Sequence, residues 1–406
     1  MDFDDSPEEA AFREEARAWL DTVAKRRGEG RGAWRDFRAR TEEQDAAQMV
    51  AAKRWQAMLC DEGWAGLHWP VAHGGRGLSA HLAGVFGEEL SHYDTYSGFF
   101  MIGVDMVGPT LMAHATPEQQ ARFLRPMLRG EEVWCQLFSE PGAGSDLAGL
   151  STRAERDGDE FVINGQKVWT SSAHVADLGM LLARTDLDKP KHRGITYFLL
   201  DMDTPGVEVR GLRQIDGAIH FNEVFFTDVR VPADRVVGEV NDGWRVALTT
   251  LTAERTAIGG GGRTRFVDMV DHAREFGMND DPVWRQELAK LYTRYQLQRF
   301  LGYRVRTAIT HGRQPGPESS VMKLLNSQHV EHIGNVAVGT MGPAGMLWHD
   351  DAKDGGFWQD SFLFQWSSRI GGGTEQVQRN IIGERVLGLP KEPGHNRDLP
   401  FRSLPK

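Results

Sequence analysis

The spacing of apolar residues divides this chain into a helical block, a strand-rich block and a second helical block. Near the start, Phe12, Ala16 and Leu20 recur at the spacing of one helix face. Around Glu132 the pattern changes to short apolar runs separated by turn residues, and from Gly243 the helical period returns. The order α, β, α is consistent with three packed layers around ligand clefts.

Two helix starts carry capping sequences. Ser6-Pro7-Glu8-Glu9 and Thr116-Pro117-Glu118-Gln119 each provide a capping hydroxyl, a proline at the first helical position and a Glu or Gln at the third. We expect a helix after each of them. Helical patterning also predicts helices over residues 46–62 and 79–92.

The middle block has the pattern of β-strands. Residues 161–169 form two short strand patterns joined by Asn164-Gly165, which predicts a hairpin. Further strands are expected over residues 178–184, 196–202, 207–211 and 223–231. We therefore predict an all-α domain at residues 1–132, a β domain at 133–238, an all-α domain at 239–390 and an irregular tail at 391–406.

Composition narrows the classes of protein. The 406 residues are 40% hydrophobic and 26% charged, which excludes a disordered chain. The net charge of −10 disfavours nucleic-acid binding, and the two cysteines form no CxxC pair that would hold zinc. His329 and His332 lack a third ligand, so no metal is expected.

The sequence gives no sign of export or membrane insertion. The acidic start contains no apolar signal region, and no apolar run reaches the roughly 18 residues of a membrane span. The nearest run, residues 98–113, is interrupted by Asp105. We expect a cytoplasmic protein without membrane or nucleic-acid partners.

A glycine-rich loop occupies residues 138–146. Its glycines permit a tight turn, while the hydroxyls of Ser139 and Ser145 and closely spaced N–H groups can meet anionic or carbonyl oxygens. The loop lacks the Gly-Lys-Ser/Thr ending of a P-loop, and Leu147 stands where a dinucleotide fingerprint needs glycine. Taken alone, it is an ordinary loop of a β domain.

Four motifs, in this order, resemble those of the acyl-CoA dehydrogenases. They are SEPGAGSD at 139–146, INGQKVWTS at 163–171, EVFFTDVRVP at 223–232 and GTEQVQRN at 373–380. Because they follow one another in this order from residue 139 to residue 380, the sequence is identified as a member of that family. The resemblance implies an α+β fold with an N-terminal helical domain, a central β-barrel-like domain and a C-terminal helical bundle. It also implies FAD as cofactor, an acyl-CoA substrate and an electron-transfer flavoprotein as electron acceptor.

The resemblance also assigns a flavin site. Ser139 would hydrogen-bond the ring, Trp169 would pack beside it, and Ser171 would reach the hydride-accepting edge; an aromatic wall with hydroxyl donors suits a flat heteroaromatic ring. Ser145 would contact either the flavin phosphate side or the pantetheine. Outside the motif, Trp169 has the alternative of being a core tryptophan. The full set of expected cofactor contacts is Gln136, Phe138, Ser139, Ser145, Trp169, Thr170, Ser171, Gly339, Pro343, Thr374 and Gln376.

The expected catalytic base is Glu254. Many family members have a glutamate where this chain has Gly372, while isovaleryl-CoA dehydrogenases among others place it on a helix, at the position of Glu254. A carboxylate in a dry site beside the substrate can remove the α proton of a thioester. The competitor is Glu375, which ranks below Glu254. The structural alternative for Glu254 is a solvated helix residue paired with Arg255 or Arg263.

The substrate side of the site follows from the same resemblance. The backbone N–H of Gly372 would donate to the thioester oxygen, which needs no side chain. The expected substrate contacts are Ser145, Arg255, Gly372 and Gly373. The glycines at 259–262 have two interpretations: a wider cavity for a long, branched or ring-bearing acyl group, or close helix packing.

Three departures from the family pattern keep two other functions open. Arg274 stands one residue out of register with a family arginine that reaches the flavin of a neighbouring subunit. Residues 339–345 lack a glutamine found in the family and contain Pro343. Gly372 stands in place of the loop glutamate. The chain is then either a homodimer or homotetramer, or a subunit that shares flavin sites with a homologous chain. The other rival is a flavin oxidase or monooxygenase of the same fold.

Overall fold

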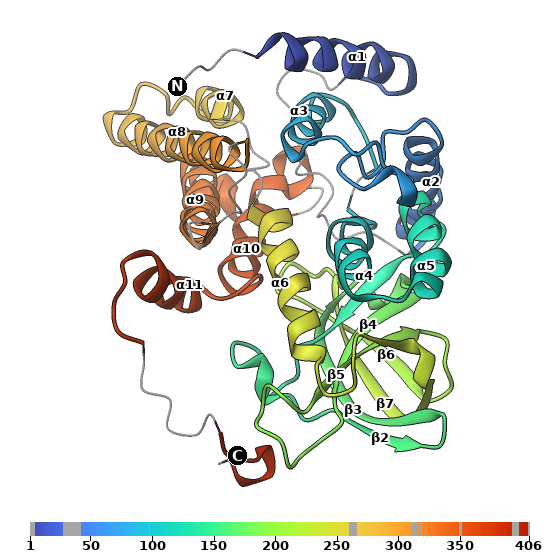
Figure 1. Cartoon of the computed structure of the whole chain (residues 1–406). Helices are drawn as coiled ribbons and strands as arrows, with labels where there is room; N and C mark the ends of the chain where they lie inside the picture. Colours follow the sequence, from blue (N-terminus) through green and yellow to red (C-terminus); the bar gives the residue numbers. More distant parts are fainter. Residues whose placement is uncertain are drawn as a thin grey trace. The chain divides into compact units, whose positions relative to one another are not determined.

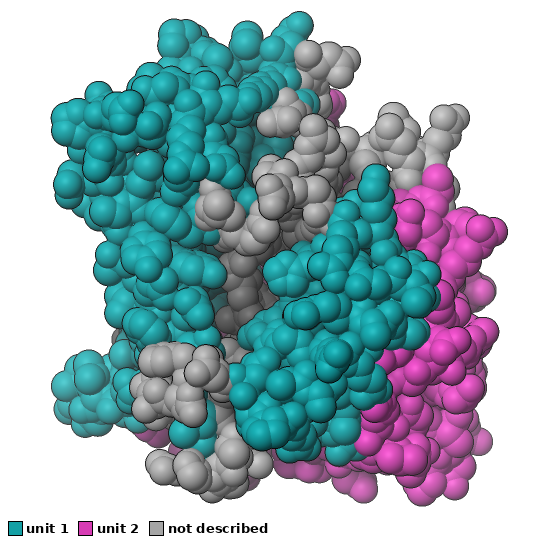
Figure 2. Space-filling model, turned by 90° about the horizontal axis from the view of Figure 1, so that it is seen from above, with its two compact units in different colours: residues 1–39, 77–95, 258–390 teal, residues 40–76, 96–257, 391–406 magenta. Residues whose placement is uncertain are grey.

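The computed structural model describes residues 5–26, 42–96, 98–259, 266–310, 316, 319–348, 351–391 and 398–404. The chain divides into two compact units, which Figure 2 colours separately. Unit 1 comprises residues 1–39, 77–95 and 258–390, and unit 2 comprises residues 40–76, 96–257 and 391–406. The predicted order of helices, strands and helices is confirmed.

Unit 2 contains the β-sheet and the helices nearest to it in sequence (Figure 1). Its helices are α2 (Glu42–Asp61), α4 (Gly108–His114), α5 (Pro117–Arg129) and most of α6 (Gly243–Gly259). A π-helical turn, Ile102–Val107, directly precedes α4. The strands are β1 (Trp134–Leu137), β2 (Arg153–Asp157), β3 (Glu160–Ser171), β4 (Leu178–Arg184), β5 (Ile195–Asp201), β6 (Val207–Leu212), β7 (Phe221–Pro232) and β8 (Val236–Val237).

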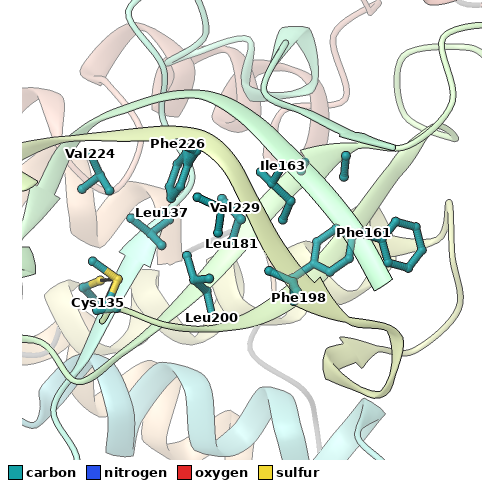
Figure 3. Close-up of a cluster of buried hydrophobic side chains, with 14 of the residues drawn as sticks. Cys135, Leu137, Phe161, Ile163, Leu181, Phe198, Leu200, Val224, Phe226 and Val229 are labelled. Atoms are coloured by element: carbon teal, nitrogen blue, oxygen red, sulfur yellow. Dashed lines mark hydrogen bonds between the residues drawn. The ribbon is translucent and has the colours of Figure 1, made fainter. Parts of the chain in front are cut away.

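The described strands form one sheet in the order β6-β7-β3-β2-β4-β5-β8, with β1 parallel to β4 at the side. Their inward side chains make the core of unit 2, and Figure 3 shows this cluster between the strands. Phe161 and Phe198 meet edge to face with ring centroids 5.1 Å apart. Every residue of β4 is buried, as is typical of a strand covered on both faces.

The hairpin predicted at Asn164-Gly165 is wrong. Strand β3 runs through this pair without a break, and the turn to its partner β2 lies at Gly158 instead. The β3–β7 register shifts at the pair, and Asn164 exchanges hydrogen bonds with Asp228 of β7. A Cβ at position 165 would lie 2.7 Å from Cα of Thr152, so the neighbouring chain requires glycine there.

Other local predictions are confirmed. Ser6 Oγ accepts from the Glu9 N–H at 3.3 Å, and Thr116 Oγ1 accepts from the Gln119 N–H at 3.3 Å, so both capping boxes form. The four strands predicted after residue 177 correspond to β4, β5, β6 and β7. The domain boundaries after residues 132, 238 and 390 stay predictions.

Unit 1 is helical in its described residues. Its helices are α1 (Pro7–Val23), α3 (Ala80–Leu90), α7 (Phe266–Glu275), α8 (Pro282–Thr310), α9 (Ser319–Thr340), α10 (Phe357–Ile370) and α11 (Glu375–Ile381). Its core packs residues of α7, α8, α9 and α10 around Ile333, Val336 and Ala337. The glycines at 260–262, expected to affect the acyl cavity, lie outside the described residues.

Candidate active site

The glycine-rich loop begins where strand β1 ends. Glu140 and Ala143 exchange two backbone hydrogen bonds of 3.0 Å, which close the loop into a tight turn. Ser139 is half-buried, and its carbonyl accepts a hydrogen bond from β3. A Cβ at Gly142 or Gly144 would meet no atom within 4 Å. The backbone at these two glycines is therefore accessible to an approaching group.

A buried ion pair joins this loop to strand β3. Lys167 Nζ donates to Glu140 Oε1 at 2.8 Å and to the Phe138 carbonyl at 2.9 Å. The Glu140 carboxylate also accepts from the N–H and hydroxyl of Ser151 and from the N–H of Thr152. The loop and the strand, which carry the two predicted flavin segments, are thus held in one register.

The surroundings shift the pKa values of both partners downward. Burial lowers the pKa of Lys167 to about 8, although Glu140 acts against this shift. Burial alone would raise the pKa of Glu140, but the ammonium and the donated hydrogen bonds outweigh it and hold that pKa below its usual range. Sequence reasoning missed this pair. The available signal was a lysine inside an apolar strand pattern, since such a lysine needs a buried partner.

The end of β3 presents an aromatic ring and hydroxyl groups. Trp169 is 61% exposed, so the alternative of a core tryptophan is wrong. Its φ of 63° is rare for a residue with a side chain, and its ring meets Phe221 edge to face at 6.0 Å. Thr170 Oγ1 is buried without a hydrogen-bond partner among the described residues, and Ser171 is half-buried. An exposed aromatic ring, together with a buried hydroxyl group that has no hydrogen-bond partner among the described residues, fits the binding of a flat heteroaromatic cofactor.

Helix α6 places Glu254 beside strand β1. The Glu254 side chain is half-buried, and its Oε2 accepts a hydrogen bond from Gln136 Nε2 at 3.2 Å. Thr250, one turn earlier on the same face, shares a 2.9 Å hydrogen bond with Thr110 of α4. The helix is therefore fixed in register one turn before the predicted base. The Arg255 side chain lies outside the described residues.

The competing carboxylate, Glu375, takes part in packing unit 1. Arg369 donates to its two oxygens at 3.0 and 3.2 Å, and Ser327 Oγ donates at 3.1 Å. Burial alone would raise the pKa of Glu375, but these donors lower it below its usual range. A carboxylate held charged by an arginine is poorly suited to remove a proton. Its surroundings therefore support the lower rank given to Glu375.

The glycine loop before α11 needs the left-handed backbone conformation. Gly372 and Gly373 have φ values of 66° and 86°. The Gln378 side chain donates to both of their carbonyls, at 3.0 and 3.2 Å. Thr374 caps the helix by accepting from the Val377 N–H. These contacts fix the loop that carries the predicted oxyanion donor.

The predicted residues are divided between the two units. Unit 2 contains Gln136, Phe138, Ser139, Ser145, Trp169, Thr170, Ser171, Glu254 and Arg255. Unit 1 contains Gly339, Pro343, Gly372, Gly373, Thr374 and Gln376. A Cβ at Gly339 would lie 2.5 Å from the Trp284 ring, so helix packing already explains this glycine. The roles assigned to all these residues stay predictions.

A cavity of about 820 Å³ lies elsewhere in unit 2, at the start of α5. Its lining includes Arg122, Phe123 and Arg235, and none of the predicted site residues belongs to its described lining. Arg122 and Arg235 already have acidic partners, Glu132 and Asp201. This cavity is therefore not the predicted flavin or acyl site.

Comparison with known proteins agrees with the motifs. The chain matches the family models "Acyl-CoA dehydrogenase, N-terminal domain" over residues 6–131, "middle domain" over 135–229 and "C-terminal domain" over 241–387. It is 43% identical over 345 residues to acyl-CoA dehydrogenase IpdE1 of Mycobacterium tuberculosis, covering 84% of this chain and 88% of that protein.

Solved structures show the same fold. The structure of the Tcur3481-Tcur3483 steroid ACAD matches with a TM-score of 0.81 and 30% identity, covering 97% of this chain and 100% of that one. The ChsE4-ChsE5 complex from Mycobacterium tuberculosis matches with a TM-score of 0.78 and 27% identity, covering 97% and 100%. The predicted arrangement of N-terminal helices, central β domain and C-terminal helices is confirmed.

Helices long and apolar enough to cross a membrane are absent from the described part of the chain.

The three family models together cover most of the sequence, and the match to the IpdE1 relative covers 84% of this chain at 43% identity. This chain therefore belongs to the acyl-CoA dehydrogenase family.

Proposed function

We propose that this chain oxidises a saturated acyl-CoA to the trans-2-enoyl-CoA, using FAD, with Glu254 as the base. In this reaction Glu254 takes the proton from the α carbon, and the two electrons leave as hydride from the β carbon. The backbone N–H of Gly372 donates to the thioester oxygen, which makes the α proton more acidic. Ser145, Arg255 and Gly373 complete the substrate contacts.

The observation that supports this most is the hydrogen bond between Gln136 and Glu254. Gln136 lies on β1, which continues directly into the glycine-rich loop, so the contact aligns the predicted base with the predicted flavin segment. The carboxylate is half-buried, in contrast to a solvated surface residue. A carboxylate that is partly removed from water suits a base that takes up a proton from the substrate.

The described residues of unit 2 also suit FAD. Ser139 and Ser171 offer hydroxyls, Trp169 offers an exposed ring, and the buried Thr170 hydroxyl is available for a hydrogen bond. When bound there, FAD would supply the acceptor for the β hydride. An electron-transfer flavoprotein is the expected electron acceptor of the enzyme. A cytoplasmic location is part of the same proposal.

The test is anaerobic mixing of the purified yellow protein with a panel of acyl-CoA thioesters while the flavin absorbance is followed. We expect bleaching in the parent and a loss of about a hundred- to ten-thousand-fold in its rate for Glu254→Gln. The control is Glu239→Gln, an exposed glutamate just before α6, which should bleach as the parent does. Equal bleaching by Glu254→Gln and the parent would refute the assignment. Rapid reoxidation by oxygen would favour an oxidase instead.

A second proposal concerns the subunit composition of the enzyme, which is either a homo-oligomer of this chain or a heteromer with a homologous chain. Two of the solved structures that match this chain are named as pairs of different chains, Tcur3481-Tcur3483 and ChsE4-ChsE5. Together with the displaced Arg274, this supports a chain that shares its flavin sites with a homologue. A chain that is colourless and inactive alone, but yellow and active with such a homologue, would support the heteromer. Full flavin content and activity of the chain alone would support a homodimer or homotetramer.

A further inference from the structure

Residues 398–404, called the tail segment below, pack within unit 2 at the C-terminal end of the described chain (Figure 1). They lie against residues 185–194, which connect β4 to β5 and are called the β4–β5 loop. The N–H of Phe401 donates to the carbonyl of Lys189 at 2.9 Å, and the next N–H along the tail segment donates to the carbonyl of Leu187 at 3.1 Å. The tail segment is therefore bound to this loop through its backbone.

A buried arginine lies under this contact. Arg184, the last residue of β4, is 1% exposed, and the ring of Phe401 covers its guanidinium group, whose central carbon is 3.5 Å from the ring centroid. Burial lowers the pKa of Arg184 to about 10, because the guanidinium group is removed from water. An aromatic face stabilises a cation in this position, most of all a desolvated one. Phe401 thus takes the place of water over a buried charge.

The same guanidinium group holds the backbone that follows the glycine-rich loop. Its Nη2 and Nε donate to the carbonyls of Ala148 and Leu150 at 2.7 and 3.0 Å. Its Nη1 donates to the carbonyl of Lys191 at 3.2 Å. Among the described residues, the hydrogen bonds of this side chain all go to backbone carbonyls. Arg184 therefore ties the end of the glycine-rich loop to the β4–β5 loop, and Phe401 covers the junction.

A second connection reaches the glycine-rich loop itself. Lys191 Nζ donates to both carboxylate oxygens of Asp146, at 2.8 and 2.7 Å. Asp146 directly follows Ser145, a predicted substrate contact. The next residue of the β4–β5 loop, His192, meets Trp244 of α6 edge to face, with ring centroids 5.0 Å apart. The loop therefore contacts both the segment of Ser145 and the helix of the proposed base, all within unit 2.

We propose that Phe401 is a positioning residue for the acyl-CoA site. By covering Arg184, it keeps the segment of Ser145 in the conformation that binds the thioester, and so raises the affinity for acyl-CoA. This inference rests on the proposed function, because Ser145 is one of its substrate contacts. The tail segment acts through Arg184 and the β4–β5 loop, and no bond is made or broken at Phe401.

The effect follows from the cost of ordering a loop when a ligand binds. Without the ring, water reaches the guanidinium group, and its hydrogen bonds to Ala148 and Leu150 must compete with hydration. The segment of Ser145 then adopts its binding conformation for a smaller fraction of the time, and the apparent dissociation constant rises by the same factor. In the bound complex the segment is ordered again, so the rate of the bound complex is unchanged. A higher KM at constant kcat is the expected result.

The test measures KM and kcat of flavin-loaded variants with an acyl-CoA that bleaches the parent. Phe401→Ala should raise KM about 10-fold and leave kcat within about twofold. Phe401→Tyr keeps the ring and should behave as the parent does. Phe401→Leu, which keeps an apolar side chain without an aromatic face, should raise KM in the same direction and replaces Phe401→Ala if that variant does not fold.

The matched control is Phe225→Ala. The Phe225 ring also lies over a guanidinium group, that of Arg210, with 4.5 Å between its central carbon and the ring centroid. This pair belongs to strands β7 and β6, away from the chain that Arg184 holds. Phe225→Ala therefore removes a similar ring and a similar contact, and should leave KM close to that of the parent.

A binding measurement separates this inference from the proposed reaction. An S-alkyl-CoA thioether, which lacks the thioester carbonyl and cannot react, is titrated calorimetrically into the flavin-loaded parent and each variant. If no acyl-CoA bleaches the flavin but Phe401→Ala binds the thioether about 10-fold more weakly than the parent and Phe401→Tyr, the proposed reaction fails and this inference stands. Unchanged thioether affinity in Phe401→Ala, an equal loss in Phe225→Ala, or a loss of flavin without a loss of thioether affinity would overturn it.

Discussion

Glu140 and Glu254 both lie beside strand β1, but unit 2 holds them differently. Glu140 is buried and receives four described hydrogen bonds, one of them from the Lys167 ammonium. Glu254 is half-buried, and it accepts a hydrogen bond from the neutral amide of Gln136. Charged and numerous donors hold a carboxylate ionised, whereas a base must be able to take up a proton. The comparison separates a carboxylate that supports the fold from the one proposed as the base.

The carboxylate of Glu375 in unit 1 is surrounded by hydrogen-bond donors in the same way as that of Glu140. It is buried, an arginine and a serine donate to it, and its pKa is lowered. Arg369 is partly exposed, with 28% of its side-chain surface accessible, so this pair is less isolated from water than Glu140 and Lys167. Glu140 and Glu375 should therefore matter mainly for stability, and Glu254 mainly for rate.

The largest effect on stability is expected for Glu140→Gln. It leaves the fully buried ammonium of Lys167 without its counter-charge, and breaking such a pair costs about 3–5 kcal/mol. We expect this loss in the free energy of unfolding from denaturant titration, together with weaker flavin retention, because the pair joins the two flavin segments. In the double variant Glu140→Gln/Lys167→Met much of the stability should return. A double variant no more stable than Glu140→Gln would contradict this account.

The pH dependence of stability tests the same pair. Burial lowers the pKa of Lys167 to about 8 from the ordinary value of 10.5, so the unfolded chain binds more protons between these values. The contribution of Lys167 to the free energy of unfolding should therefore rise as the pH rises from about 8 to 10.5, and stay constant below that window, where the lysine is protonated in both states. Lys167→Met, measured at the same pH values, isolates this contribution. A constant difference between the two proteins would contradict the shift.

Glu375→Gln should have a smaller effect on stability, about 2 kcal/mol, because the partly exposed Arg369 regains water. The rate of flavin bleaching per folded molecule should stay close to that of the parent. Glu254→Gln is the matched variant and should show the reverse, with stability nearly unchanged and bleaching lost. Loss of bleaching in both variants would mean that the two glutamates are not separated in this way.

Gln136→Leu should have the smallest effect, which we expect in the pH dependence of flavin bleaching. The amide hydrogen bond favours the charged form of Glu254, so its removal should make that carboxyl group easier to protonate. The acidic limb of the pH profile for flavin bleaching should therefore move to higher pH. Flavin affinity is measured alongside, because Gln136 is also a predicted cofactor contact. An unmoved limb at normal flavin affinity would show that the hydrogen bond does not tune the base.

Local sequence was sufficient where neighbouring residues decide the structure. The capping boxes at Ser6 and Thr116 form because their donors and acceptors lie three residues apart. The apolar run at 178–184 became the buried strand β4, and the order of motifs identified the family. The Asn164-Gly165 prediction failed because β3 pairs with β2 and β7 on either side of this pair, and that pairing overrode a local turn preference.

The sequence by itself determined the succession of helices and strands, the family, and Glu254 as the proposed base, because each depends on short spacings or on motifs within one segment. Only the tertiary structure decided that Glu140 pairs with Lys167 and that Trp169 is exposed. The physical reason is that burial and hydrogen bonding depend on segments far apart in the chain. Charge and pKa follow from those contacts, and no local pattern specifies them.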